Sequence, residues 1–250
     1  MNVLYEDNHI IVVNKQSGEI VQGDKTGDTP LSDIVKSYLK EKYNKPGNVY
    51  LGVVHRLDRP VSGVVLFAKT SKALPRLNKL FAEHEKVKKT YWAIVRSEEL
   101  RVKSEELTNS QLSTVNCQLS TLNCQLPEWH TLTHWLTRNE KTNTAKAYDH
   151  EVPNSKRAVL KYRFIGQSER YSLIEVELMT GRHHQIRCQL SKIGYPIKGD
   201  LKYGAPRSNP DGSICLHARK LELEHPVTHE LLSITAPVPK DALWQAFEKG

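Results

Sequence analysis

The sequence has 250 residues, enough to bury a full hydrophobic core in one domain or two. Its 36 Lys and Arg residues against 28 Asp and Glu residues give a net charge of +8, which favours a polyanionic partner but also fits an ordinary basic enzyme. Residues 1–7 lack the basic segment of a signal peptide, and the apolar run at 10–13 is too short to cross a membrane. We therefore expect a cytoplasmic protein with no membrane contact.

The first part of the chain alternates short apolar runs with amphipathic segments. The predicted elements are two strands around an Asp-Asn turn at 3–14, helices at 29–43 and 71–85, and a strand at 87–95. Ser71 is the expected N-cap of the second helix. Lys15 follows the first strand pair and is either a phosphate contact or a solvated lysine. Tyr91, in the strand at 87–95, would by itself be interpreted as a core aromatic.

Asp58 lies between two β-branched runs, residues 53–54 and 64–68, which predict two strands joined by a tight connection. Pro60 fixes its own φ, and Gly63 allows a backbone conformation that a side chain would forbid, so the carboxylate should have a fixed direction. A catalytic carboxylate needs such a direction. The alternative is a loop Asp that makes an Asx-turn and pairs with a neighbouring Arg.

Residues 101–127 differ from the rest of the chain. A seven-residue segment at 111–117 is repeated at 118–124, but its Ser, Thr and Asn content is poor for a helix and two units are too few for a coiled coil. We interpret it as a low-complexity insertion. Cys117 and Cys124 occupy equivalent positions of the repeat, so we expect free thiols and no disulfide framework.

After the insertion, order is expected to return near residue 144. The predicted elements are a hairpin of strands at 158–165 and 171–178, a helix at 180–193, strands at 217–224 and 230–235, and a last helix near 241–248. Thr180 is the expected cap of the helix that contains Arg187. Arg187 borders the apolar stripe of this helix, and a buried guanidinium requires a carboxylate partner. His183, His184 and Cys188 could suggest a metal site, but further ligands are missing.

Residues 55–63, His-Arg-Leu-Asp-Arg-Pro-Val-Ser-Gly, resemble the His-Arg-Leu-Asp-x-x-Thr-Ser-Gly signature of the RluA family of RNA pseudouridine synthases, with Val61 in place of Thr. Further stretches resemble that family in the same order: Lys-x-Tyr-x-Ala-x-Val at 89–95, Thr-Gly-Arg-Thr-His-Gln-Ile-Arg at 180–187, Gly-x-Pro-Ile-x-Gly-Asp-x-x-Tyr-Gly at 194–204 and Leu-His-Ala at 216–218. His183 replaces Thr in the second of these.

The resemblance implies an α+β fold with a central mixed or antiparallel sheet, flanking helices and an RNA-binding cleft. It implies a single catalytic domain over residues 1–250, interrupted by 101–127, of the small type without an S4 domain. It also implies isomerisation of uridine to pseudouridine in structured rRNA or tRNA, with no cofactor and no metal. We expect a monomer.

The resemblance also implies a role for each site residue. Asp58 would be catalytic, Arg187 would keep it ionised, and Tyr91 would stack on the target base. The implied substrate contacts are Leu216, which would pack on the base, and Arg56, Arg59, Lys15 and His184. Two alternatives remain: a non-catalytic RNA-binding protein on the same fold, and a nucleoside or glycoside hydrolase, for which no second catalytic acid is evident.

Overall fold

The computed structural model describes residues 1–24, 27–83, 86–97 and 128–249. The predicted insertion at 101–127 lies outside the described residues. The described chain forms two compact units, one of residues 1–91 with 209–249 and one of residues 92–208. The prediction of a single catalytic domain is not tested by this division and stays a prediction.

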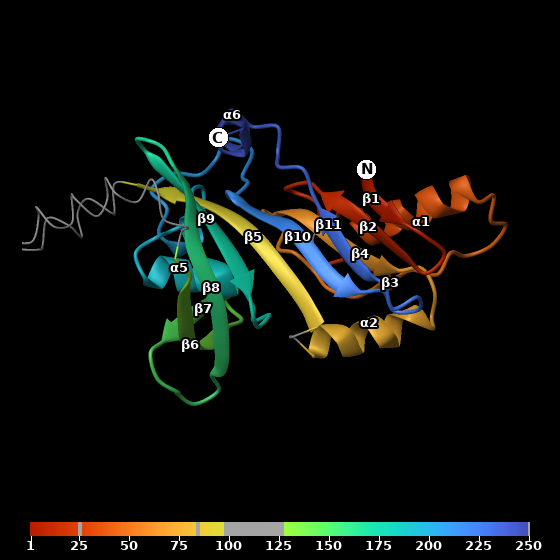
Figure 1. The fold of residues 1–250 in the computed structure, drawn as a ribbon, viewed down its shortest axis with the longest axis horizontal. Coiled ribbons are helices and arrows are strands. Elements are labelled where there is room, and N and C mark those ends of the chain that lie inside the picture. Colours follow the sequence, from red (N-terminus) through yellow and green to blue (C-terminus); the bar gives the residue numbers. More distant parts are fainter. Residues whose placement is uncertain (25–26, 84–85, 98–127, 250) are drawn as a thin grey trace, which may run out of the picture. The chain divides into compact units, whose positions relative to one another are not determined.

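The first unit combines a mixed sheet with three helices (Figure 1). Its strands are β1 (Asn2–Glu6), β2 (Ile10–Lys15), β3 (Gly52–Val53), β4 (Ser62–Ala68), β10 (Leu216–Glu224) and β11 (Leu231–Thr235), and its helices are α1 (Leu31–Lys42), α2 (Ala73–Ala82) and α6 (Ala242–Lys249). The strand order is β1-β2-β4-β10-β5, where β5 (Val87–Arg96) continues into the second unit. β4 and β10 are parallel, whereas β2 is antiparallel to both β1 and β4.

The core of the first unit lies around β2 and β4. Both strands are buried along their whole length, as expected of near-continuous apolar runs that are covered on two faces. Leu77 of α2 packs into this core together with Leu66 of β4. The predicted helix at 71–85 is therefore present, but it begins at Ala73. The side-chain oxygen of Thr70, and not that of Ser71, accepts the N–H of Ala73.

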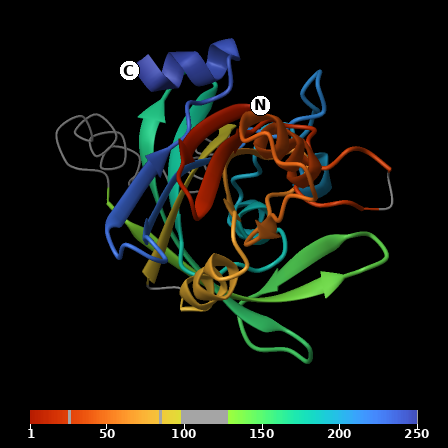
Figure 2. The same cartoon turned by 90° about the vertical axis from the view of Figure 1, so that its right-hand side faces the viewer.

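The second unit is built on antiparallel strand pairs in the order β5-β9-β8-β6-β7. Its elements are β6 (His130–Asn139), β7 (Thr144–Tyr148), β8 (Lys156–Gln167), β9 (Tyr171–Leu178), α5 (Gln185–Lys192) and the short 3-10 helix η2 (Leu201–Tyr203). The predicted hairpin is confirmed as β8 and β9, and Figure 2 shows these strands and the β6–β7 pair as extended green to teal ribbons. β6 was not predicted from the sequence.

The N-cap of helix α5 lies four residues later than predicted. Its N-cap is His184, in the left-handed region with φ 49°, and no side chain caps the helix. Thr180 instead accepts the N–H of Val159 on β8 and donates its own hydroxyl to Gln185. Across the described residues, no helix is both long enough and apolar enough to cross a membrane.

Candidate active site

The loop that carries Asp58 is a tight turn at the start of β4. The N–H of Val61 donates to the carbonyl oxygen of Asp58 at 3.0 Å, which closes the turn. The carbonyl oxygen of Pro60 accepts the N–H of Ile214 at 3.1 Å and the hydroxyl of Ser17 at 3.1 Å. Segments far apart in the sequence therefore bind the backbone of this loop. The fixed direction of the Asp58 carboxylate stays a prediction.

Lys15 is the main anchor of the loop. Its side chain has no exposed surface, and its Nζ donates to the carbonyl oxygens of Arg59 at 3.0 Å, Val61 at 2.6 Å and Gln16 at 3.0 Å. Burial lowers the pKa of Lys15 to about 8, while the negative charges of Glu19 and Asp58 raise it. All three donors of Lys15 are therefore used inside the protein, where they hold the loop, and the predicted substrate contact stays a prediction.

Gly63 fixes the position of β4 against β10. Its φ is +118°, and a Cβ on it would lie 2.3 Å from the carbonyl oxygen of Ala218. Only glycine avoids both the strained backbone and this clash. The close approach allows the parallel pairing of Gly63 with Ala218 and of Ser62 with His217. Leu216 precedes this pairing by one residue and is buried, with 4% of its surface exposed.

A buried hydrogen bond between Ser62 and His217 supports the same junction. The Ser62 Oγ lies 2.8 Å from Nδ1 of His217. Burial lowers the pKa of His217 to about 4, so the ring is neutral near pH 7 and can accept the hydroxyl proton. Sequence reasoning named Leu216 in this motif but gave no role to the histidine beside it.

Tyr91 lies within electrostatic reach of Asp58 in the same unit. Its side chain is buried, with 9% exposed. Burial raises the pKa of the Tyr91 hydroxyl, and the negative charge of Asp58 raises it further. The negative charge of Asp58 therefore acts on two other predicted groups, the phenol of Tyr91 and the ammonium of Lys15.

Two arginines of the signature are exposed. Arg56 is exposed directly before the buried Leu57. Arg59 places Nη2 2.7 Å from Oδ2 of Asp28, with both side chains about half exposed. Exposed guanidinium groups next to a carboxylate loop are suited to phosphate contacts, because a pair at the surface is only weakly stabilised and is easily exchanged.

Arg187 lies in the second unit and has a carboxylate partner there. Its Nε and Nη2 bind the two oxygens of Asp200 at 2.7 and 2.8 Å, with both residues almost fully buried. Its guanidinium also lies 5.0 Å from the ring centroid of Tyr203. The predicted need for a partner is confirmed, but the partner that the structure shows is Asp200. The pairing with Asp58 stays a prediction. Sequence reasoning noted the Gly-Asp-x-x-Tyr-Gly stretch without giving Asp200 or Tyr203 a role.

His184 is buried next to the same group. Its ring stacks on His183 at 3.8 Å between centroids, and its Nδ1 lies 2.9 Å from the hydroxyl of Tyr203. With 7% of its surface exposed, His184 belongs to the packing around Tyr203. The RNA contact that the resemblance implies for it stays a prediction. No group of three or more potential ligands is placed to hold a metal ion in the part of the chain that the structure describes.

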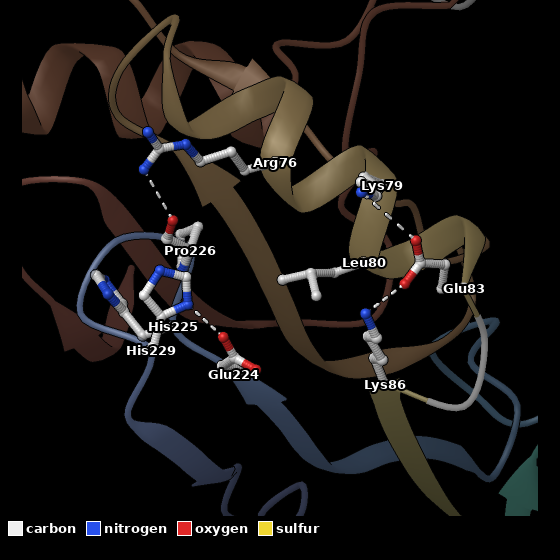
Figure 3. Close-up of a pocket in the computed structure, with 9 residues that line it drawn as sticks. All are labelled: Arg76, Lys79, Leu80, Glu83, Lys86, Glu224, His225, Pro226 and His229. Atoms are coloured by element: carbon white, nitrogen blue, oxygen red, sulfur yellow. Dashed lines mark hydrogen bonds and ion pairs between the residues drawn. The ribbon is translucent and has the colours of Figure 1, made fainter.

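A separate hollow of about 350 Å³ lies between α2 and the turn after β10 (Figure 3). Lys79 and Lys86 on its rim both pair with Glu83, at 4.0 and 2.7 Å, and His229 pairs with Glu224. Its charges are therefore largely balanced within the protein. None of the predicted site residues lines it, and we assign it no part in the reaction.

Comparisons with known proteins show the family of this chain. Residues 9–192 match the family described as RNA pseudouridylate synthase. A tRNA pseudouridine synthase C from Pectobacterium carotovorum subsp. carotovorum is 32% identical over 265 residues, which cover 98% of this chain and 60% of that protein. The uncharacterized RNA pseudouridine synthase YhcT of Bacillus subtilis (strain 168) is 31% identical over 245 residues, covering 96% of this chain and 70% of that protein.

The fold has also been seen in solved structures. The structure of human RNA pseudouridylate synthase domain containing 4 aligns with a TM-score of 0.70 and 22% identity, covering 97% of this chain and 90% of that one. The α+β fold with a mixed sheet, which the sequence predicted, is confirmed.

Proposed function

We propose that this chain, which belongs to the RNA pseudouridylate synthase family, isomerises uridine to pseudouridine in RNA. We also propose that the Asp58 carboxylate is the catalytic group. The observation that carries this proposal is the anchoring of the Asp58 loop by Lys15, Gly63 and the neighbouring strands. Such anchoring fixes the backbone that carries the carboxylate, and a reaction at a sugar carbon requires a carboxylate in a fixed position.

The reaction breaks the bond between N1 of uracil and C1′ of ribose and forms a bond between C5 and C1′. The proton on C5 is lost, and N1 gains one. Asp58 would either attack C1′ as a nucleophile or remove the 2′ proton to give a glycal. Both routes leave the detached uracil in the site while it turns over, and neither requires a redox cofactor or a metal.

Tyr91 and Leu216 are the groups we propose to hold the detached base. Both side chains are buried and lie in the same unit as Asp58. A phenol ring can stack on a base, and an aliphatic side chain can exclude water from its other side. The raised pKa of Tyr91 keeps its hydroxyl protonated and neutral at physiological pH. Arg187 is proposed to favour the ionised form of Asp58 through its positive charge.

The substrate is proposed to be an rRNA or a tRNA. A base in such RNA is paired or stacked and must first be flipped out, which costs a few kcal/mol. Arg56 and Arg59, which are exposed beside the Asp58 loop, would offset that cost through phosphate contacts. We further propose that the enzyme acts as a cytoplasmic monomer. Mapping pseudouridines in RNA from cells with and without the gene identifies the target.

Substitution of Asp58 by Asn tests the catalytic assignment. The change keeps the size of the side chain but removes its charge, so tritium release from RNA labelled at C5 of uridine should fall by at least roughly 10²-fold. RNA binding should stay close to that of the wild type. Asp33→Asn, on the exposed face of α1, is the matched control and should keep full activity. An active Asp58→Asn variant would remove this residue from the mechanism.

The same assay separates the second candidate function. A non-catalytic RNA-binding protein would bind RNA through the exposed arginines, yet the wild type would release no tritium. A hydrolase would instead release free uracil.

A further inference from the structure

His55 opens the signature that contains Asp58, and the reaction described above gives it no role. It follows β3, at the point where the chain leaves the sheet. β2 pairs with one edge of β4 along residues 63–68. β3 and β10 must therefore share the other edge, where β3 pairs through Val53 with Phe67 and β10 pairs through Ala218 with Gly63.

A gap in the ladder lies between these two pairings. In the described register, residues 64–66 of β4 have no strand partner on this edge. Leu66 has no exposed surface, so its N–H does not reach bulk solvent. A buried backbone donor without an acceptor costs free energy comparable to a lost hydrogen bond. The N–H of Leu66 therefore requires an acceptor from outside the strands.

The imidazole of His55 supplies that acceptor. The N–H of Leu66 donates to its Nε2 at 3.1 Å. An accepting Nε2 carries no proton, so the ring is neutral with its proton on Nδ1. Burial lowers the pKa of His55 to about 3, and the positive charge of Lys89 acts in the same direction. The ring also stacks on Phe81 of α2, with 4.9 Å between centroids and 22° between planes.

We propose that His55 is a positioning residue for Asp58. The imidazole of His55 takes the place of a strand carbonyl opposite Leu66 and so fixes where the chain turns away from β4. The inference rests on the proposed function, since it concerns the same carboxylate. Only two residues, Arg56 and Leu57, separate His55 from Asp58. A short segment transmits a displacement at its start almost undiminished to its end, and a misplacement of about 1 Å can cost roughly 10²-fold in rate.

Three variants test this role. His55→Leu keeps an apolar side chain but removes the acceptor, whereas His55→Gln places an amide oxygen close to the position of Nε2. Leu77→Ala, in the core of the same unit, is the control for general destabilisation. The measurements are kcat and KM for pseudouridine formation below the melting temperature of every variant, and hydrogen exchange at the Leu66 amide.

We expect His55→Leu to lower kcat by roughly 10–100-fold with KM nearly unchanged. Exchange at Leu66 should become faster, His55→Gln should restore most of the rate, and Leu77→Ala should leave kcat unchanged. A His55→Leu variant with wild-type kcat, an equal loss in Leu77→Ala, or a folded His55→Gln variant as slow as His55→Leu would each overturn the proposal.

Failure of the proposed function is distinguishable from failure of this inference. A wild type that forms no pseudouridine contradicts the function. Exchange at Leu66 still tests the hydrogen bond in that case, because the exchange rate does not depend on activity. Faster exchange in His55→Leu supports the anchoring role, and unchanged exchange overturns it.

Discussion

The Nζ atom of Lys15 lies 2.6 Å from the carbonyl oxygen of Val61, three residues beyond Asp58. A buried ammonium is costly unless each of its donors finds an acceptor. Here the acceptors are carbonyls of the Asp58 loop and of the lysine's own turn, so desolvation of Lys15 is offset only when the loop is correctly folded. The loop and the end of β2 are therefore coupled.

Substitution of Lys15 by Met should reduce both stability and activity. Met fills a similar volume but removes the ammonium that donates to the carbonyl oxygens of Gln16, Arg59 and Val61. The Arg59 oxygen keeps the N–H of Gly18 as a donor, and we expect the unfolding free energy to fall by about 2–4 kcal/mol. Urea unfolding measures this loss, and tritium release should show a lower kcat. Lys36→Met is the control, because Lys36 is exposed and forms only a surface pair with Asp33. It should change stability by less than about 1 kcal/mol.

Substitution of Gly63 by Ala should disrupt the junction of β4 and β10. The added Cβ meets the backbone of Ala218, which cannot move without breaking the parallel pairing. We expect a loss of at least about 2 kcal/mol in stability together with loss of activity. Gly47→Ala is the control, because a Cβ on Gly47 meets no atom within 4 Å. The melting temperatures of the two variants in thermal unfolding are compared. Equal melting temperatures for the two variants would contradict the prediction.

The Arg187–Asp200 pair should behave as a buried ion pair. Asp200→Leu leaves the guanidinium buried without its carboxylate and should cost about 3–5 kcal/mol. Arg187→Met combined with Asp200→Leu should cost less than the sum of the single changes, because neither charge is then left unpaired. Denaturant unfolding of the double-mutant cycle measures the coupling. Asp149→Asn, which affects the exposed pair with Lys192, should cost less than about 1 kcal/mol.

Glu6 should make stability depend on pH. Burial raises its pKa, but hydrogen bonds from Lys42, Lys69 and Tyr43 lower it more, to about 2. Because the pKa of Glu6 in the folded protein lies below its value in the unfolded chain, the ionised carboxylate stabilises the fold by about 3 kcal/mol. This stabilisation is fully present above about pH 5 and is lost as the pH falls toward 2.

Urea unfolding of the wild type and Glu6→Gln across this range tests the sign. The difference in unfolding free energy between the two proteins should be largest at pH 7 and should shrink steadily below pH 5. A difference that is constant with pH would show that the Glu6 carboxylate is not specifically stabilised.

Local patterns in the sequence predicted much of the fold. Period-two and continuous apolar runs gave β1, β2, β4 and the β8–β9 hairpin. β6 was missed because its buried positions include the polar side chain of His134, whose Nδ1 lies 2.9 Å from the side-chain nitrogen of Gln189 on α5. No apolar periodicity marks a strand whose buried face is partly polar. The start of α5 was misplaced for a related reason: Thr180 is bound to β8 and does not cap the helix.

The sequence by itself determined the family signature and the loop that presents Asp58, because these depend on residue type and local spacing, and the class of fold followed from the resemblance that this signature carries. Only the tertiary structure decided the partners of the buried polar groups. Lys15 forms a hydrogen bond with Val61, 46 residues along the chain. Arg187 forms one with Asp200, 13 residues along the chain, and His55 forms one with Leu66, 11 residues along the chain. A group removed from water must bond with whichever acceptor or donor folding brings within about 3 Å. That proximity is a property of the packed chain and leaves no periodic pattern in its sequence.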